Sequence, residues 1–265
     1  MVQVSNRRGI ILAGGAGTRL SPITKYIVKQ FAPVYDKPMI YYPLYTMLKM
    51  GIREILFIST PDATPVLEKN LGNGSEFGAS FQYAVQASPN GIAQAFVIGR
   101  DFVGDKPSCL ILGDNVFYGA ECQNAFSSAC AGNENVIFGY PVSDPERYGV
   151  VEFDKDGNAI SIEEKPRMPK SNYAVPGIYF YENEVLEIAA GLKPSARGEY
   201  EITDVNAELM RRGRLKVVPL GPGNAYLDTG TFESLNDASQ FVRTIQLRTG
   251  LKVCDILEFA GGGGQ

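Results

Sequence analysis

The chain has 265 residues, 45% of them hydrophobic, which is enough for one large domain or two small ones with a buried core. Its formal net charge of −4 argues against binding nucleic acid by general electrostatics, and no apolar run approaches the length of a membrane span. The absence of histidine excludes histidine bases, Ser-His triads and histidine-ligated zinc. With no signal-like start, a cytoplasmic location is expected.

Short β-rich runs alternate with helical patterns through the first half of the chain. Strands are predicted at 9–13, 54–59, 80–85, 108–112 and 135–140, and helices at 42–50, 65–71, 93–99 and 122–131. Strands that alternate with helices pair in parallel, so the pattern predicts a layered α/β fold. Ligands of such sheets bind at the carboxyl ends of the strands.

The second half of the chain begins with a predicted β-hairpin. Its strands are 148–153 and 159–164, joined by the polar turn 154–158. A strand at 177–181 and a helix at 184–190 follow. We find no internal repeat or long linker, so a single domain is expected over 1–253, with 254–265 as a shortened or frayed tail.

The strand at 9–13 ends in a glycine turn that contains Gly14, Gly15 and Gly17. Glycines there allow backbone N–H groups to face an anion, and Arg19 adds a forked cation suited to phosphate. The P-loop pattern fails because no Lys follows the last glycine, and the dinucleotide fingerprint fails because position 20 is Leu20. The turn predicts a nucleotide triphosphate site; the alternative is a turn that only connects two elements.

Two aspartates and two lysines could complete such a site. Asp114 follows the predicted strand 108–112, and Asp228 stands where an apolar stretch gives way to Gly230. Two carboxylates at strand ends could share one Mg²⁺ with substrate phosphates, although each Asp alone is more often a turn or capping residue. Lys29 and Lys165 are candidate phosphate cations; the alternative for each is an ordinary solvated lysine.

Several longer motifs, in order, resemble the sugar-phosphate nucleotidyltransferases between about residues 9 and 253. They lie at 12–20, 29–30, 35–44, 144–153, 163–166, 192–199 and 226–231. The resemblance implies a Rossmann-like three-layer α/β fold, with a mixed, mostly parallel central sheet and helices on both faces, in a homotetramer. It also implies that Mg²⁺, dTTP and α-D-glucose 1-phosphate are bound and that dTDP-glucose and pyrophosphate are formed. The nucleotide would bind to about 1–120 and the sugar phosphate to about 121–253, with no nucleic acid or membrane partner.

The resemblance also assigns roles to individual residues. Those implied in catalysis are Arg19, Lys29, Asp114, Lys165 and Asp228, of which Asp114 and Asp228 would hold the metal. Those implied in nucleotide binding are Leu12, Gly14, Gly15, Ala16, Gly17, Thr18, Arg19, Lys29, Gln30, Gln86, Pro89, Gly91 and Asp114, with Gln86 and Gly91 at the thymine. Those implied around the sugar phosphate are Asn115, Tyr148, Gly149, Glu164, Lys165, Val175, Tyr179, Arg197 and Tyr226.

Three positions depart from the family pattern. Tyr226 stands where Trp is frequent, Phe232 where His is usual, and Asn90 where Asp is common. Two alternatives stay open on sequence alone: another base or sugar, as in a uridylyltransferase, and a non-catalytic binding module. The intact carboxylates of Asp114 and Asp228 argue against the second alternative.

Overall fold

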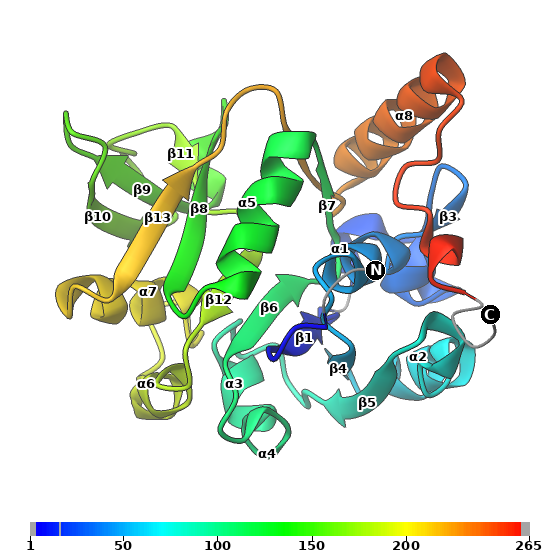
Figure 1. Ribbon diagram of the computed structural model, residues 1–265, viewed down its shortest axis with the longest axis horizontal. Helices are drawn as coiled ribbons and strands as arrows, with labels where there is room; N and C mark the ends of the chain where they lie inside the picture. The colour runs from blue at the N-terminus through cyan, green and yellow to red at the C-terminus, as the bar shows by residue number, and fades with distance from the viewer. Residues whose placement is uncertain (1–3, 16, 261–265) are drawn as a thin grey trace. The chain divides into compact units, whose positions relative to one another are not determined.

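The computed structural model describes residues 4–15 and 17–260, and Figure 1 shows the order of their helices and strands. The chain divides into two compact units. The first unit comprises Met1–Ser88, Ile111–Tyr118 and Ala225–Gln265, and the second comprises Pro89–Leu110 and Gly119–Asn224. The mixed sheet with its helices confirms the predicted α/β three-layer fold class.

The first unit is built on a parallel sheet. β1 (Arg8–Leu12) pairs with β4 (Glu54–Ser59), which pairs with β5 (Ser80–Val85), and the last residues of β6 (Ser108–Leu112) lie on the other side of β1. Ile10 and Ile11 are fully buried. A parallel strand covered on both faces has this continuous apolar sequence, which is why β1 is recognisable before the glycine turn.

Helices α1 (Tyr41–Lys49), α2 (Thr64–Leu71) and α8 (Phe232–Thr249) belong to this unit. α8 begins with a capping box, in which the Thr231 hydroxyl accepts the Ser234 backbone N–H at 3.1 Å. It ends at Gly250, whose φ of 72° is the left-handed conformation common at helix C-termini.

Two small antiparallel pairs complete the first unit. β7 (Asn115–Tyr118) pairs with β14 (Ala225–Asp228), and β2 (Pro33–Val34) pairs with β3 (Lys37–Pro38). The chain after α8 packs on α1: the Phe259 ring lies 5.7 Å from the Tyr45 ring, and Glu258 pairs with Lys49 at 2.9 Å. The segment assigned to a tail therefore packs on the unit through Cys254, Ile256 and Phe259, whereas Gly261–Gln265 lie outside the described residues.

The second unit holds the strand order β10-β9-β11-β8-β12, with β13 also paired to β8. These strands are β8 (Asn135–Pro141), β9 (Gly149–Phe153), β10 (Ala159–Glu164), β11 (Tyr173–Ala174), β12 (Ile178–Tyr181) and β13 (Leu215–Pro219). Its helices are α3 (Gln94–Ile98), α4 (Arg100–Val103), α5 (Ala120–Ala131), α6 (Val185–Gly191) and α7 (Ile202–Arg211). Phe126 of α5 packs edge-on against Phe138 of β8, with ring centroids 4.8 Å apart, which attaches the helix to the sheet.

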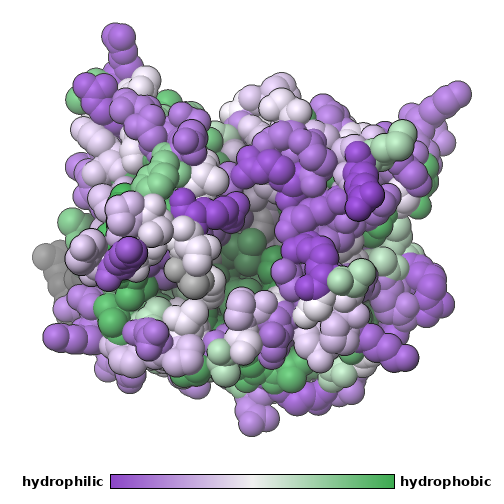
Figure 2. All heavy atoms as spheres, turned by 180° about the vertical axis from the view of Figure 1, so that it is seen from behind, coloured by the Kyte–Doolittle hydropathy of each residue, from purple (hydrophilic) through white to green (hydrophobic). Residues whose placement is uncertain are grey.

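Most predicted elements are confirmed, including the antiparallel hairpin of β9 and β10. The sequence analysis missed the helices α4, α7 and α8 and the strands β2, β3, β7, β11, β13 and β14. Within the described part of the chain, no helix is long and apolar enough to cross a membrane. On the face drawn in Figure 2, hydrophilic residues predominate and apolar ones form only small patches.

Candidate active site

The loop after β1 departs from the strand at Gly14. A Cβ on Gly14 would lie 2.9 Å from Oε1 of Gln86, which is buried, so a side chain at position 14 would displace Gln86. Gly17 has φ 60°, and its carbonyl accepts a hydrogen bond from Thr24 at 3.0 Å. The predicted glycine turn therefore has a backbone that needs glycine, while Ala16 lies outside the described residues.

The strand end before this loop is held by two buried side chains. The carbonyl of Ala13 accepts hydrogen bonds from Nε2 of Gln30 at 2.5 Å and from the hydroxyl of Ser59 at 2.8 Å. The carbonyl of Ser59 in turn accepts the backbone N–H of Gln86 at 2.7 Å. The amide nitrogen of Gln30 thus fixes the carbonyl that directly precedes the glycine loop.

A close ion pair joins two of the predicted catalytic residues. Nζ of Lys29 lies 2.5 Å from Oδ2 of Asp114, and the side chains are 9% and 26% exposed. Nδ2 of Asn115 donates to the other carboxylate oxygen at 3.0 Å. Both oxygens of Asp114 therefore have a protein donor, and about a quarter of its side chain stays exposed.

Asp228 stands beside Asp114 because β14 pairs with β7. The backbone N–H and hydroxyl of Thr229 both donate to the carbonyl of Asp114, at 3.1 and 2.8 Å. The position that a Cβ on Gly230 would take lies 2.9 Å from a terminal nitrogen of Arg19 and 3.4 Å from Oδ2 of Asp228. The first unit therefore gathers two cations and two carboxylates next to the glycine loop.

This donor set fits a hard divalent cation. Mg²⁺ is held by one or two carboxylates together with substrate phosphates and water. Within the described residues, no group of three or more His, Cys, Asp or Glu side chains could hold a metal by itself. Asp114 and Asp228 could hold such an ion together with phosphate oxygens and water.

In the second unit, Glu164 at the end of β10 is the centre of a polar cluster. Its carboxylate accepts the hydroxyl of Thr203 at 2.5 Å and a guanidinium nitrogen of Arg197 at 3.1 Å. Nζ of Lys165 lies 3.7 Å from the same carboxylate. Lys165 itself has φ 43°, and its N–H donates to the carbonyl of Tyr148 at 2.9 Å, so β10 ends in a turn that exposes the lysine.

Carboxylates outnumber cations around Arg197. Besides Glu164, its guanidinium contacts Glu199 at 3.0 Å and Glu201 at 3.6 Å. The hydroxyl of Ser195 donates to Glu201 at 2.8 Å, and burial raises the pKa of the Glu201 carboxyl. The positive charge of Arg197 is therefore largely compensated within the protein.

Buried groups of the same unit surround this cluster. The N–H of Val175 donates to the carbonyl of Gly149 at 2.8 Å. Tyr179 is only 3% exposed; burial raises the pKa of its hydroxyl, and the charge of Glu164 raises it further. Tyr179 therefore stays protonated and can donate a hydrogen bond at neutral pH.

The predicted base-binding segment of the second unit lies against Tyr200. The N–H of Tyr200 donates to the carbonyl of Asn90 at 2.7 Å, and its carbonyl accepts the N–H of Ala93 at 3.2 Å. A Cβ on Gly91 would lie 2.3 Å from the Tyr200 carbonyl oxygen, so only glycine fits. The segment is thus tied to the loop that carries Arg197.

The two units divide the predicted site residues. The first unit holds Leu12, Gly14, Gly15, Gly17, Thr18, Arg19, Lys29, Gln30, Gln86, Asp114, Asn115, Tyr226 and Asp228. The second holds Pro89, Gly91, Tyr148, Gly149, Glu164, Lys165, Val175, Tyr179 and Arg197. Asn115 and Tyr226 thus belong to the first unit, whereas the other predicted sugar-phosphate residues belong to the second. The Tyr226 ring stacks on the Phe117 ring, with centroids 5.4 Å apart. Their predicted roles stay predictions.

Sequence reasoning missed Ser59, Thr203 and Glu201. Ser59 had a signal, because a polar residue ends an otherwise apolar buried strand. Thr203 had none, because its partner Glu164 is 39 residues away.

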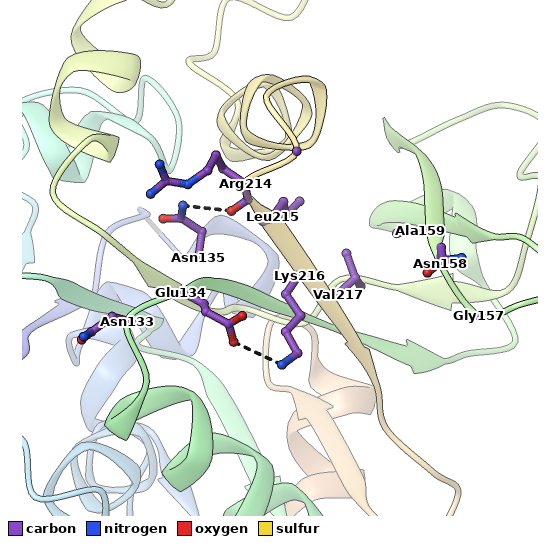
Figure 3. A pocket seen from close by; sticks show the side chains of 11 residues that line it. Asn133, Glu134, Asn135, Gly157, Asn158, Ala159, Arg214, Leu215, Lys216 and Val217 are labelled. Atoms are coloured by element: carbon purple, nitrogen blue, oxygen red, sulfur yellow. Dashed lines mark hydrogen bonds and ion pairs between the residues drawn. The ribbon is translucent and has the colours of Figure 1, made fainter.

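A separate cavity of about 430 Å³ lies in the second unit (Figure 3). It is lined by residues 133–135, 157–159 and 213–217, none of which is a predicted site residue. Among these lining residues, Nζ of Lys216 pairs with the carboxylate of Glu134 at 3.1 Å (Figure 3). This cavity therefore shares no residue with the Asp114 and Glu164 clusters described above.

Comparisons with known proteins place the chain among nucleotide-transferring enzymes. The family model described as nucleotidyl transferase matches residues 8–245. A glucose-1-phosphate thymidylyltransferase of Xanthomonas campestris pv. campestris is 55% identical over 262 residues, which are 98% of this chain and 89% of the relative. One of Mycolicibacterium smegmatis is 57% identical over 246 residues, 93% of this chain and 85% of the relative. The crystal structure of a Bacillus anthracis protein in complex with sucrose has a TM-score of 0.82 at 41% identity, covering 89% of this chain and 95% of that one.

Proposed function

This chain belongs to the nucleotidyl transferase family, and we propose that it transfers a thymidylyl group from dTTP to α-D-glucose 1-phosphate. The observation that carries the proposal is the joint placement of Arg19, Lys29, Asp114 and Asp228 at the glycine loop. Curated relatives of similar length at 55–57% identity carry this activity in their names.

The reaction needs positioning and charge neutralisation and no proton transfer. A phosphate oxygen of glucose 1-phosphate, already anionic at neutral pH, attacks the α-phosphorus, and pyrophosphate leaves. Phosphoryl-type transfers are accelerated mainly by orientation and electrostatic stabilisation, so the absence of histidine costs nothing. In this proposal Arg19 and Lys29 stabilise the charge that develops on the leaving pyrophosphate.

Asp114 and Asp228 would hold Mg²⁺, since their oxygens fit its preference. When bound, the ion would neutralise phosphate charge and orient the triphosphate. Lys29, whose Nζ pairs with Asp114 at 2.5 Å, would add a second positive charge for the phosphates at this site.

The residues of the second unit would bind the sugar phosphate. Glu164, with one side of its carboxylate held by Thr203 and the other by Arg197, would accept hydrogen bonds from sugar hydroxyls. Three carboxylates compensate the positive charge of Arg197. In this proposal Arg197 therefore orients the Glu164 carboxylate and does not serve as the main phosphate cation. Lys165, 43% exposed, would then be the main cation for the sugar phosphate.

Pyrophosphate release, measured with four nucleotides against several sugar 1-phosphates, tests the proposal. We expect dTTP with glucose 1-phosphate to be the best pair, dTTP to exceed dUTP by tens-fold at most, and dCTP to be poor, because one methyl group is worth only about 1–3 kcal/mol. Lys165→Ala should mainly raise the KM for the sugar phosphate. Highest activity with UTP, or with another sugar, would make the protein a different member of the family.

We also propose that the protein is a homotetramer, which analytical ultracentrifugation would test.

A further inference from the structure

Ser59, the last residue of β4, is fully buried and bonds in two directions. Its hydroxyl donates to the carbonyl of Ala13 at 2.8 Å, and its own carbonyl accepts the N–H of Gln86 at 2.7 Å. One buried serine therefore contacts both the strand end that leads into the glycine loop and Gln86, which the family resemblance places at the thymine.

The Ala13 carbonyl is where the regular pairing of β1 stops. The N–H of Ala13 still donates to Ile58 at 2.8 Å, as in the sheet, but its carbonyl accepts the side chains of Ser59 and Gln30 instead of a strand partner. A carbonyl oxygen has two lone pairs, so these two donors satisfy it completely.

The direction of this carbonyl decides the direction of the next N–H group. The peptide between Ala13 and Gly14 is planar, and in a trans peptide the N–H points opposite to the carbonyl. Fixing the carbonyl toward Ser59 and Gln30 therefore fixes the Gly14 N–H on the opposite side, where it can donate to an anion.

We propose that Ser59 is a positioning residue of the triphosphate site: its hydroxyl fixes the Ala13–Gly14 peptide so that the Gly14 N–H meets a phosphate oxygen of dTTP. The inference rests on the proposed function and adds a residue to it. Gln86 is bonded to the backbone of Ser59 and not to its hydroxyl. A substitution that removes the hydroxyl should therefore weaken binding of the triphosphate and leave binding of the base unchanged.

Calorimetric binding of dTTP and of thymidine to Ser59→Ala provides the test. We expect the Kd for dTTP to rise about tenfold, the effect of losing about one hydrogen bond, and the Kd for thymidine to stay within twofold. The ratio of kcat/KM for dTTP over dUTP should stay unchanged as well. Ser108→Ala, which removes the same hydroxyl from another fully buried strand residue, should leave both affinities within twofold.

Equal weakening of dTTP and thymidine, or no weakening of either, would overturn the proposal, as would the same loss in Ser108→Ala. If Ser59→Ala does not fold, Ser59→Cys decides, because a thiol keeps the volume and is a weak donor; it should show the same split at smaller size. A wild-type protein that releases no pyrophosphate from dTTP and glucose 1-phosphate would refute the proposed function instead. An active wild type with unchanged dTTP affinity in Ser59→Ala would refute only the role of Ser59.

Discussion

Replacing Asp114 by Asn should cost stability as well as activity, because Asp114 neutralises a buried lysine. Nζ of Lys29 lies 2.5 Å from Oδ2 of Asp114, and the lysine side chain is only 9% exposed. Breaking a buried pair costs about 3–5 kcal/mol, mostly from the charge left without a partner. The carboxylate is 26% exposed, and an Asn oxygen can still accept from the ammonium, so we expect about 1–3 kcal/mol here.

Urea unfolding at neutral pH, alongside pyrophosphate release, measures both effects. Glu187→Gln is the matched control: it removes a carboxylate paired with Arg100 at 2.8 Å, but the Glu187 side chain is 77% exposed, so the loss should stay below about 1 kcal/mol. The double variant Lys29→Met/Asp114→Asn removes both charges and should regain most of the stability that Asp114→Asn loses, without regaining activity.

Two results would refute this reasoning. If Asp114→Asn has the stability of the wild type, the buried charge of Lys29 does not need the Asp114 carboxylate as its partner. A double variant no more stable than Asp114→Asn would mean that the loss does not come from an unpaired Lys29.

Three further outcomes are expected. EDTA should abolish pyrophosphate release and Mg²⁺ should restore it; activity that survives chelation would contradict the metal assignment. Gln86→Glu should lower kcat/KM for dTTP by placing a carboxylate against the thymine O4, and an unchanged value would mean that the base is read elsewhere. Burial alone would raise the pKa of Asp36, but hydrogen bonds from Lys37, Gln246 and Lys252 hold it below its usual 3.8. The stability advantage of wild type over Asp36→Asn should therefore be full above about pH 4 and shrink as the pH falls further, measured as the difference in urea midpoint between pH 7 and pH 3.

The strands of the sheet were readable from sequence because burial imposes a local pattern. β4, β5, β6 and β10 have the predicted bounds, since each is a β-rich run that turn residues or charged residues delimit. α7 and α8 were missed although their buried apolar residues recur at helical spacing, as Ile202, Val205 and Leu209 in α7 and Leu235, Ala238 and Val242 in α8. For α8 a local signal existed, in the Thr231 and Ser234 capping box and in Gly250.

By itself the sequence determined which residue types end each strand: the glycine turn after β1, Asp114 after β6 and Lys165 after β10. These follow from local patterns of burial and turn chemistry. Only the tertiary structure decided which of them meet. Lys29 and Asp114 are 85 residues apart and Glu164 and Thr203 are 39 apart, and no local pattern encodes a contact across such distances. Ser59 acquires its partners only because β4 lies beside β1, so the burial of whole strands, and not any short motif, places its hydroxyl on the Ala13 carbonyl.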